Sequence, residues 1–404
     1  MTRAIAFVLF AGAALIGHTT FVDADARLPP VPEREWSAAQ RAIVDRFAEN
    51  GRPTNALRTY LHHPTLAENI LPFERYITRE STLSARHREL LILRTAWLCR
   101  SEYVWALHAE RARDAGIGSD ELARIAGGPD ARGWQPFEAV LLRAVDELLV
   151  DSFISDSTWA GLSARFDTRQ LMDAVFTVAE FTMIAGTVNS LEVGVDGWLK
   201  ERLPAAIAST PAAVRTNVRL IGKSARITPL EPVDWSPEVK VWLARYGDRP
   251  VASIYRTYAR HLAMDRPRTS VSEHIRQDST LSPRIRELLI VRIGVLCRSE
   301  YEWAAHAPAL RRAGMTDAEI QAVVDGPTAL RDPVESALLR AVDELYKDAV
   351  VSGGTWRDLS ARFDARQMLD ILTTIGGYRM VSMALNTFGV QLEADAERFP
   401  SALR

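Results

Sequence analysis

The sequence predicts an all-α protein built from two copies of one helical domain, related by pseudo-twofold symmetry. The first observation is an internal repeat, since residues 81–103 return as residues 279–301 with most positions unchanged. The second is the spacing of apolar residues, which recur three and four positions apart as on one face of a helix. The third is that no alternating run of polar and apolar residues marks a strand. A single duplication of so long a unit predicts two domains and not a solenoid of short repeats.

In the first copy, apolar residues at helical spacing predict helices over 90–98 and 140–148. Gly116 is expected to end a helix between them, because glycine is favoured just past a helix C-terminus. Residues Asp167 to Gln170 resemble a capping box, in which the first side chain accepts a backbone hydrogen bond and the fourth bonds back. This motif predicts where the last helix of the copy begins.

The second copy has the same kinds of helix start and stop signals. Ser282-Pro283 and Asp332-Pro333 each place a capping residue before a proline, which is favoured at the first position of a helix. Residues 316–319 and 364–367 resemble capping boxes, and Gly314 corresponds to Gly116. We therefore expect the same order of helices in both copies.

The N-terminus resembles a secretory signal peptide. Arg3 precedes an apolar run over 5–17 that is too short to span a bilayer, and Ala24-Asp-Ala26 is a small-x-small cleavage pattern. We expect residues 1–26 to be removed and the mature protein to be exported, periplasmic or secreted, with no stable membrane span. The alternatives are a cytoplasmic protein and one anchored by its N-terminal helix.

A stretch rich in Pro, Ala, Ser and Thr over 204–232 is the predicted linker. It separates a first domain, 27–203, from a second, 233–404. We expect the two domains to pack through equivalent faces, as two protomers of a dimer would. We also expect the fused chain to form a homo-oligomer.

Composition excludes several functional classes. The 49 Lys and Arg residues nearly balance the 51 Asp and Glu residues, and a formal charge of −2 gives no basic field for nucleic acid. Two cysteines among 404 residues exclude a disulfide scaffold and the cysteine-rich zinc modules.

Residues with acid–base chemistry recur at the same place in both copies. In the first they are Glu89, Cys99, Tyr103 and His108, and in the second Glu287, Cys297, Tyr301 and His306. Ser101 and Ser299 are placed to cap a new helix, so each glutamate can reach its histidine only if two helices pack as a hairpin. A glutamate, a histidine and a hydroxyl or thiol that meet there make a plausible proton-transfer site. No pair of histidines has metal-ligand spacing, so we expect no metal.

The motifs Arg-x-Arg-Glu-Leu, Ser-Glu-Tyr-x-Trp-Ala-x-His-Ala, Gly-Pro and Arg-Ala-Val-Asp-Glu-Leu occur in both copies. They resemble the carboxymuconolactone decarboxylase family, over about 55–200 and 250–392. The resemblance implies the all-α fold that this family shares with alkylhydroperoxidase D-like proteins.

This chain is similar to the peroxidase branch of that family at two positions in each copy. Glu89 and Glu287 match its relay glutamate, and His108 and His306 match its histidine. Its Cys-x-x-Cys pair is absent here, because positions 101 and 104 hold Ser and Val and positions 299 and 302 hold Ser and Glu. Cys99 and Cys297 lie two residues too early for that pair. Peroxide reduction by a dithiol therefore lacks its nucleophiles.

The decarboxylase branch implies acid–base chemistry, without a cofactor, on a small carboxylated lactone or related organic acid. Such a lyase needs a cation for the carboxylate and a group that protonates the enolate left when CO₂ departs. The histidines, the tyrosines and Glu302 are the candidate acids and bases. The candidate substrate-binding residues are Arg94, Arg100 and Trp105 and their counterparts Arg292, Arg298 and Trp303.

Two other functions stay open. One is a peroxiredoxin-type antioxidant that uses a single cysteine per domain, and the other is a non-catalytic exported binding protein. Each residue also has a structural alternative: the cysteines as small buried hydrophobes, the tryptophans as core, and residues 146–147 and 343–344 as structural acids. Because Glu302 lies one turn before His306, we expect the two sites to have diverged.

Overall fold

The computed structural model describes residues 26–49, 51–204, 224–247, 250–400 and 403. Within these ranges the chain is helical, with no strand and one isolated bridge between Glu49 and Arg52, so the all-α prediction is confirmed. The predicted signal peptide, except for Ala26, and residues 205–223 of the predicted linker lie outside the described residues.

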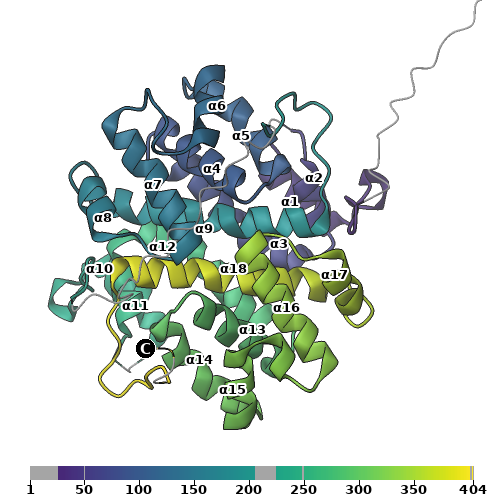
Figure 1. Ribbon diagram of the computed structural model, residues 1–404, viewed down its shortest axis with the longest axis vertical. Helices are drawn as coiled ribbons and strands as arrows, with labels where there is room; N and C mark the ends of the chain where they lie inside the picture. The colour runs from purple at the N-terminus through teal and green to yellow at the C-terminus, as the bar shows by residue number, and fades with distance from the viewer. Residues whose placement is uncertain (1–25, 50, 205–223, 248–249, 401–402, 404) are drawn as a thin grey trace, which may run out of the picture.

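The two domains have the same order of helices (Figure 1). The first contains η1(Glu33–Glu35), α1(Ala38–Phe47), α2(Asn55–Tyr60), α3(Pro64–Arg75), η2(Tyr76–Glu80), α4(Ala85–Leu98), α5(Glu102–Asp114), α6(Ser119–Gly127), α7(Pro136–Asp151), α8(Asp156–Ser163) and α9(Thr168–Leu191). The second contains η3(Pro232–Asp234), α10(Pro237–Leu243), η4(Ala244–Tyr246), α11(Ser253–Tyr258), η5(Ala259–His261), α12(Leu262–Glu273), η6(His274–Asp278), α13(Pro283–Leu296), α14(Glu300–Arg312), α15(Asp317–Asp325), η7(Pro327–Ala329), α16(Pro333–Asp348), α17(Gly353–Ser360) and α18(Ala365–Phe388).

The predicted caps begin these helices. Asp167 accepts a hydrogen bond from the Gln170 backbone N–H at 2.9 Å and begins α9, and Asp364 does the same for α18. Each glutamine side chain in turn accepts a hydrogen bond from the backbone N–H of its aspartate, which completes both capping boxes. Pro283 and Pro333 are the first residues of α13 and α16, as predicted.

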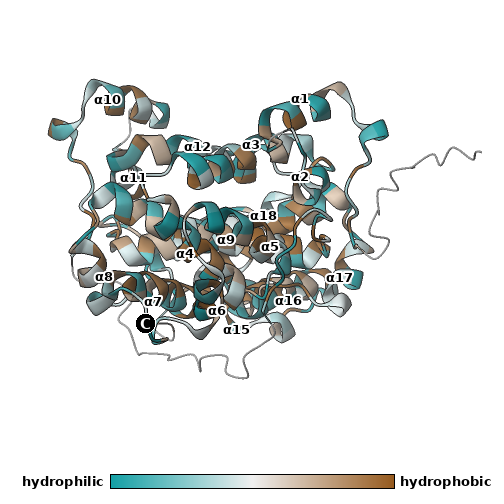
Figure 2. Cartoon of the chain, turned by 90° about the horizontal axis from the view of Figure 1, so that it is seen from above, coloured by the Kyte–Doolittle hydropathy of each residue, from teal (hydrophilic) through white to brown (hydrophobic). Residues whose placement is uncertain are grey.

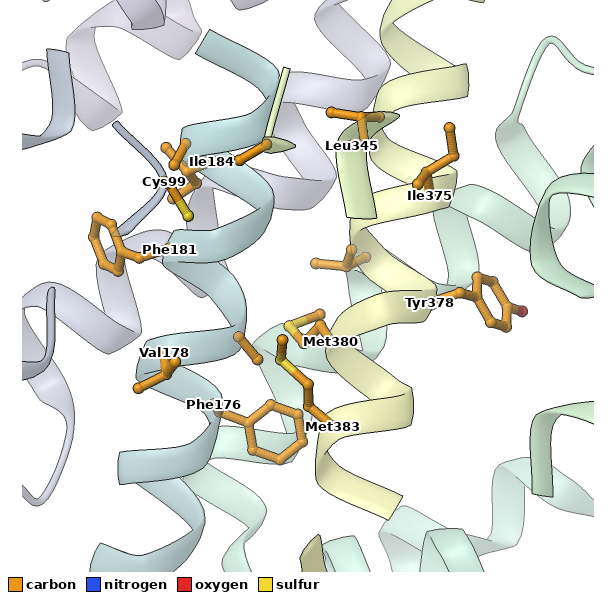
Figure 3. Packing of buried hydrophobic residues seen from close by; sticks show 14 of the residues in the cluster. Cys99, Phe176, Val178, Phe181, Ile184, Leu345, Ile375, Tyr378, Met380 and Met383 are labelled. Atoms are coloured by element: carbon orange, nitrogen blue, oxygen red, sulfur yellow. The ribbon is translucent and has the colours of Figure 1, made fainter. Parts of the chain in front are cut away.

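The domains meet through equivalent helices. α9 and α18 run side by side through the middle of the molecule and make the most extensive contact between helices among the described residues (Figure 1). Side chains such as Phe176 of α9 and Met383 of α18 fill the space between them (Figure 3). α3 and α12 form a second pair. Packing through equivalent faces is therefore confirmed.

α9 is long and apolar enough to cross a membrane by length and composition alone, with a mean hydropathy of 1.5 in its most apolar window. Every residue of that window is buried inside the protein. The composition of α9 is therefore explained by its place in the core.

Polar clusters also join the domains. The Tyr76 hydroxyl lies 2.9 Å from an oxygen of Asp173 in its own domain and 2.9 Å from Nε2 of His261 in the other. At the equivalent place, Asp370 lies 2.8 Å from His274 Nε2 and 3.4 Å from Nε2 of the first domain's His63. All these side chains are buried, so the polar groups hold the two domains in one register.

Two arginines bind across the junction at the surface. The Arg27 guanidinium donates to the carbonyls of Ser190 in the first domain and Val351 in the second, at 3.0 and 2.7 Å. Arg226 donates in the same way to Thr387 and Ile154, at 3.2 and 2.7 Å.

Candidate functional site

A helical hairpin brings each predicted glutamate to its histidine. α4 and α5 of the first domain are joined by a three-residue turn, and Glu89 Oε2 lies 2.8 Å from His108 Nδ1. In the second domain, Glu287 Oε2 lies 2.7 Å from His306 Nδ1. The predicted meeting of these side chains is therefore confirmed in both copies, although their catalytic role stays a prediction.

In the first domain this pair is enclosed. His108 is 1% exposed, and the ring of Phe181 packs edge-on against it, with centroids 4.7 Å apart. Nη1 of Arg111 lies 3.3 Å from His108 Nε2, and Arg111 is also paired with Glu49. Because a guanidinium only donates, Nε2 accepts and the imidazole proton lies on Nδ1, where it is donated to Glu89.

The same surroundings set the charges of the first site. Burial lowers the pKa of His108, Glu89 offsets part of this effect, and the positive charge of Arg111 adds to it. Burial would raise the pKa of Glu89, but His108 and Arg111 outweigh it and the pKa of this carboxyl is lowered. The first site is thus held as a neutral imidazole beside a carboxylate.

In the second domain the histidine lies between two carboxyl groups. Oε2 of Glu302 is 3.3 Å from His306 Nε2, so each ring nitrogen of His306 faces a glutamate. Burial raises the pKa of Glu302 to about 7, with the nearby Glu287 adding to the rise and His306 opposing it. Ala309 stands where the first domain has Arg111. The second site therefore contains a carboxyl group, that of Glu302, that exchanges its proton near neutral pH.

A cavity of about 250 Å³ opens beside His306. It brings together the predicted residues His306, Glu302 and Tyr301 with residues that the sequence analysis did not single out: Arg268, Arg276, Tyr246, Tyr255 and Tyr378. Four of these five come from helices before α13, and no local pattern in the sequence signals that they line one cavity with α14. The repeat gave one indirect signal, because Ile70, Val104 and Phe181 stand in the first domain where Arg268, Glu302 and Tyr378 stand in the second.

A cavity of similar size in the first domain has a different lining. Glu89 and Arg111 form part of its wall, with Glu49, Arg79 and Arg88. Two further acids, which do not line this cavity, were not anticipated in the first domain. Burial raises the pKa of Glu74 to about 7, and it raises the pKa of Glu180, whose oxygens have no hydrogen-bond partner, well above its usual range. The two copies therefore differ in charge around the same Glu–His pair.

The prediction that Arg94 and Arg292 hold a substrate carboxylate is wrong. Arg94 is fully buried and makes a bidentate ion pair with Asp146, at 2.7 and 2.9 Å. Its Nη1 donates to two carbonyls at the end of α6. Arg292 and Asp343 repeat the arrangement with both distances at 2.7 Å. These guanidiniums tie helices together, and the structural reading of Asp146 and Asp343 is confirmed.

Arg100 and Arg298 lie at the turn of each hairpin, exposed and with left-handed backbone (φ 51° in both). They are about two helical turns, or about 10 Å along the axis, from the histidines. Arg100 instead lines a cleft of about 1010 Å³ between the domains. The structure does not bring these two arginines to the Glu–His pairs.

The two tyrosines anchor neighbouring chain segments. The Tyr103 hydroxyl donates to Asp196 at 3.0 Å and accepts from the Ala56 backbone N–H at 3.1 Å. Tyr301 bonds Glu393 and the Ile254 backbone in the same way. Burial raises the pKa of both phenols. Tyr301 alone also lines the cavity beside His306.

The remaining predicted residues belong to the core. Trp105 packs edge-on against Trp97 with centroids 6.2 Å apart, and Trp303 packs near Phe399 at 5.7 Å. The two cysteine side chains are 3% and 1% exposed. Burial raises the pKa of Cys99 to about 11 and that of Cys297 above its usual value, which favours the reading of both as small hydrophobes.

Among the described residues, His63, His274 and Asp370 form a group whose possible metal-ligand atoms lie within 4.8 Å of one another. The Leu66 backbone N–H donates to His63 Nδ1 at 3.3 Å, which places the ring proton on Nε2, facing Asp370. The ring nitrogen of a metal-binding histidine that does not ligate normally donates a hydrogen bond, which His63 Nδ1 is not placed to do. The geometry favours a hydrogen-bonded cluster over a metal centre.

The model of the carboxymuconolactone decarboxylase family matches residues 64–147 and 263–344, one match in each domain. Among solved structures, an uncharacterized peroxidase-related protein from Silicibacter sp. TM1040 is similar over 43% of this chain and 96% of its own, with 17% identity and a TM-score of 0.38. None of the curated proteins matches the chain.

Proposed function

Because the chain belongs to the carboxymuconolactone decarboxylase family and carries its domain twice, we propose that it is a cofactor-independent acid–base enzyme whose working site is in the second domain. The observation that carries this proposal is the place of His306, which lies between two carboxyl groups at the wall of a cavity. The enclosed His108, whose pKa is lowered by burial and by Arg111, fits a structural copy of the site.

The substrate proposed is a small carboxylated lactone or related organic acid. The cavity volume of about 250 Å³ suits a small molecule, and Arg268 and Arg276 in its wall supply positive charge for a carboxylate. These two arginines replace Arg94 and Arg292 in the role that the sequence analysis gave to a cation. Decarboxylation, carbon–carbon cleavage and isomerisation are the reactions that this set of groups can serve.

For decarboxylation, the bond to the carboxylate carbon breaks and its electron pair passes into an enolate, which must then take up a proton. His306 as imidazolium can supply that proton from Nε2, while Glu287 on Nδ1 orients the ring and stabilises its charged form. Glu302, with its pKa raised to about 7, can return a proton to Nε2. Isomerisation would use the same groups in both directions.

Turnover of a panel of carboxylated lactones, followed by CO₂ release and by ring opening, tests the proposal. We expect His306→Gln to lower the rate by about 10²–10⁴-fold, the usual contribution of a general acid or base. His108→Gln is the matched control and should leave the rate within about twofold. An equal loss in both variants would contradict a working site confined to the second domain.

No observation favours the one-cysteine peroxidase, because both thiols are buried and have raised pKa values. A non-catalytic binding protein would use the same cavity, and the turnover assay separates it from an enzyme. Export after cleavage near residue 26 and assembly into a homo-oligomer remain part of the proposal. Size-exclusion chromatography of the secreted fraction, with mass spectrometry of its N-terminus, tests both.

A further inference from the structure

We propose that Tyr246 is a substrate-contacting residue, and that its hydroxyl and the Arg268 guanidinium together bind a carboxylate or carbonyl oxygen at one end of the cavity. The inference rests on the proposed function, since it concerns the same cavity. Tyr246 ends η4, which directly follows α10 in the chain, and α10 lies at one edge of the molecule (Figure 2).

The ring of Tyr246 is held in place while its hydroxyl is left without a partner. The ring stacks on Tyr255, with centroids 3.9 Å apart and planes 18° from parallel. Tyr246 lines the cavity, and its hydroxyl oxygen is buried and forms no hydrogen bond within the protein. A buried hydroxyl normally has a partner, and here an acceptor on a ligand in the cavity would provide it.

Arg268 lines the same cavity, and its positive charge acts on the Tyr246 phenol. Its Nε and Nη2 donate to Asp265 at 3.1 and 2.8 Å, and Nη1 donates to the Ser272 hydroxyl at 3.1 Å. Each terminal nitrogen carries two hydrogens, so Nη1 has a second N–H to offer where Arg268 lines the cavity. Arg276 lines it as well and brings a further positive charge, which balances an incoming carboxylate because Asp265 already balances Arg268.

The pair of Tyr246 and Arg268, called the anchor below, has no counterpart in the first domain. Aligning the arms by Arg46-Phe47 and Arg245-Tyr246 puts Phe47 opposite Tyr246, and Ile70 stands opposite Arg268. The first domain therefore keeps an aromatic ring at the first position but lacks both the hydroxyl and the guanidinium. The anchor is therefore a property of the second domain alone, as is the cavity beside its histidine.

The test is binding of 5-oxotetrahydrofuran-2-carboxylate, a saturated lactone carboxylate, measured by titration calorimetry. Tyr246→Phe removes only the hydroxyl and reproduces the first-domain residue, so the stacked ring and the fold should be kept. We expect the Kd to rise about tenfold, the effect of one hydrogen bond to a charged group. Phe47→Tyr in the first domain is the matched control and should leave the Kd unchanged.

An unchanged Kd in Tyr246→Phe, or no binding by the wild-type protein at about 10 mM probe, would overturn the inference. Its failure is distinguishable from failure of the proposed function. If binding of the probe depends on Tyr246 but no turnover depends on His306, the anchor is supported and the acid–base mechanism is contradicted. If turnover requires His306 but is unaffected by Tyr246→Phe, the acid–base mechanism is supported and the anchor is contradicted.

Discussion

The same histidine stands in two different electrostatic environments within one chain. His108 is fully enclosed and its Nε2 faces a guanidinium, whereas His306 faces a carboxyl group on each side and borders a cavity. The decisive substitutions are Val104 against Glu302 and Arg111 against Ala309. They replace a guanidinium next to Nε2 with a carboxyl group, although the backbone and the glutamate on Nδ1 are retained.

The first prediction concerns the titration of the first domain's imidazole. Burial and the positive charge of Arg111 lower the pKa of His108, so its ring should lose its proton below the usual value of 6.5. NMR titration of this ring, assigned with His108→Gln, measures the midpoint. A midpoint at or above the usual value would contradict the neutral, enclosed imidazole.

The second prediction concerns Glu302 and stability. Its pKa is raised in the folded state, so its contribution to stability is fully present below the unfolded value near 4.5 and is lost as the pH rises through about 7. Glu302→Gln mimics the protonated group. It should be close to the wild type in stability at pH 4 and more stable at pH 9, by about 3 kcal/mol, because the rise in pKa from 4.5 to about 7 is worth about 1.4 kcal/mol per unit. Urea unfolding at both pH values measures this, and the opposite order would contradict the buried, protonated carboxyl.

At the scale of the elements, the crossing of α9 and α18 depends on a small residue. A Cβ placed on Gly376 would overlap the side chain of Met183 on the opposite helix, so glycine is what lets the two backbones approach. At Gly354, near the start of α17, an added Cβ would meet open space, with the nearest atom 3.9 Å away. The two positions therefore separate close packing from the general effect of removing a glycine.

We predict that Gly376→Ala destabilises the protein by about 1–3 kcal/mol, because a methyl group must be forced into a filled contact. Gly354→Ala should be neutral or slightly stabilising, since alanine restricts the unfolded chain. Thermal unfolding of both variants measures the difference. If Met183→Ala does not recover part of the loss in Gly376→Ala, the overlap is not its cause.

For the whole molecule, the duplication turns a contact between two protomers into one within a single chain. α9 packs on α18 and α3 on α12, and each side of the junction has a buried aspartate that accepts hydrogen bonds from both domains. Asp370 accepts from His63, His274 and the Thr280 backbone and hydroxyl. Its pKa is held well below the usual range: burial would raise it, but these donors outweigh burial.

We predict that Asp370→Ala destabilises the folded chain by about 3 kcal/mol, because several buried donors lose their acceptor together. Asp358→Ala is the control, since Asp358 forms an exposed ion pair with Arg340 and should cost less than about 1 kcal/mol. Urea unfolding compares the two. A loss as small as that of the control would show that the cluster does not hold the domains together.

The sequence by itself determined the local structure and the pairing of the key residues. Capping motifs such as Asp167–Gln170 fix where helices begin because they are satisfied within four residues, and the repeat gave the two-domain architecture. The equal spacing of glutamate and histidine in both copies was enough to predict that they meet across a hairpin.

Only the tertiary structure decided which arginines face a ligand and which copy has an open site. No pattern in the sequence distinguishes Arg94 from Arg268. The Arg94 guanidinium donates its hydrogen bonds to Asp146 and two backbone carbonyls, whereas Arg268 lines a cavity. Whether Arg94 has a donor to spare depends on partners that lie 52 and 31 residues away in the chain, which local patterns do not encode. The cavity beside His306 is likewise lined by residues of α11, α12, α14 and α18, with polar residues at three positions where the first domain has apolar ones. Which distant helices line one cavity is a property of the folded chain alone.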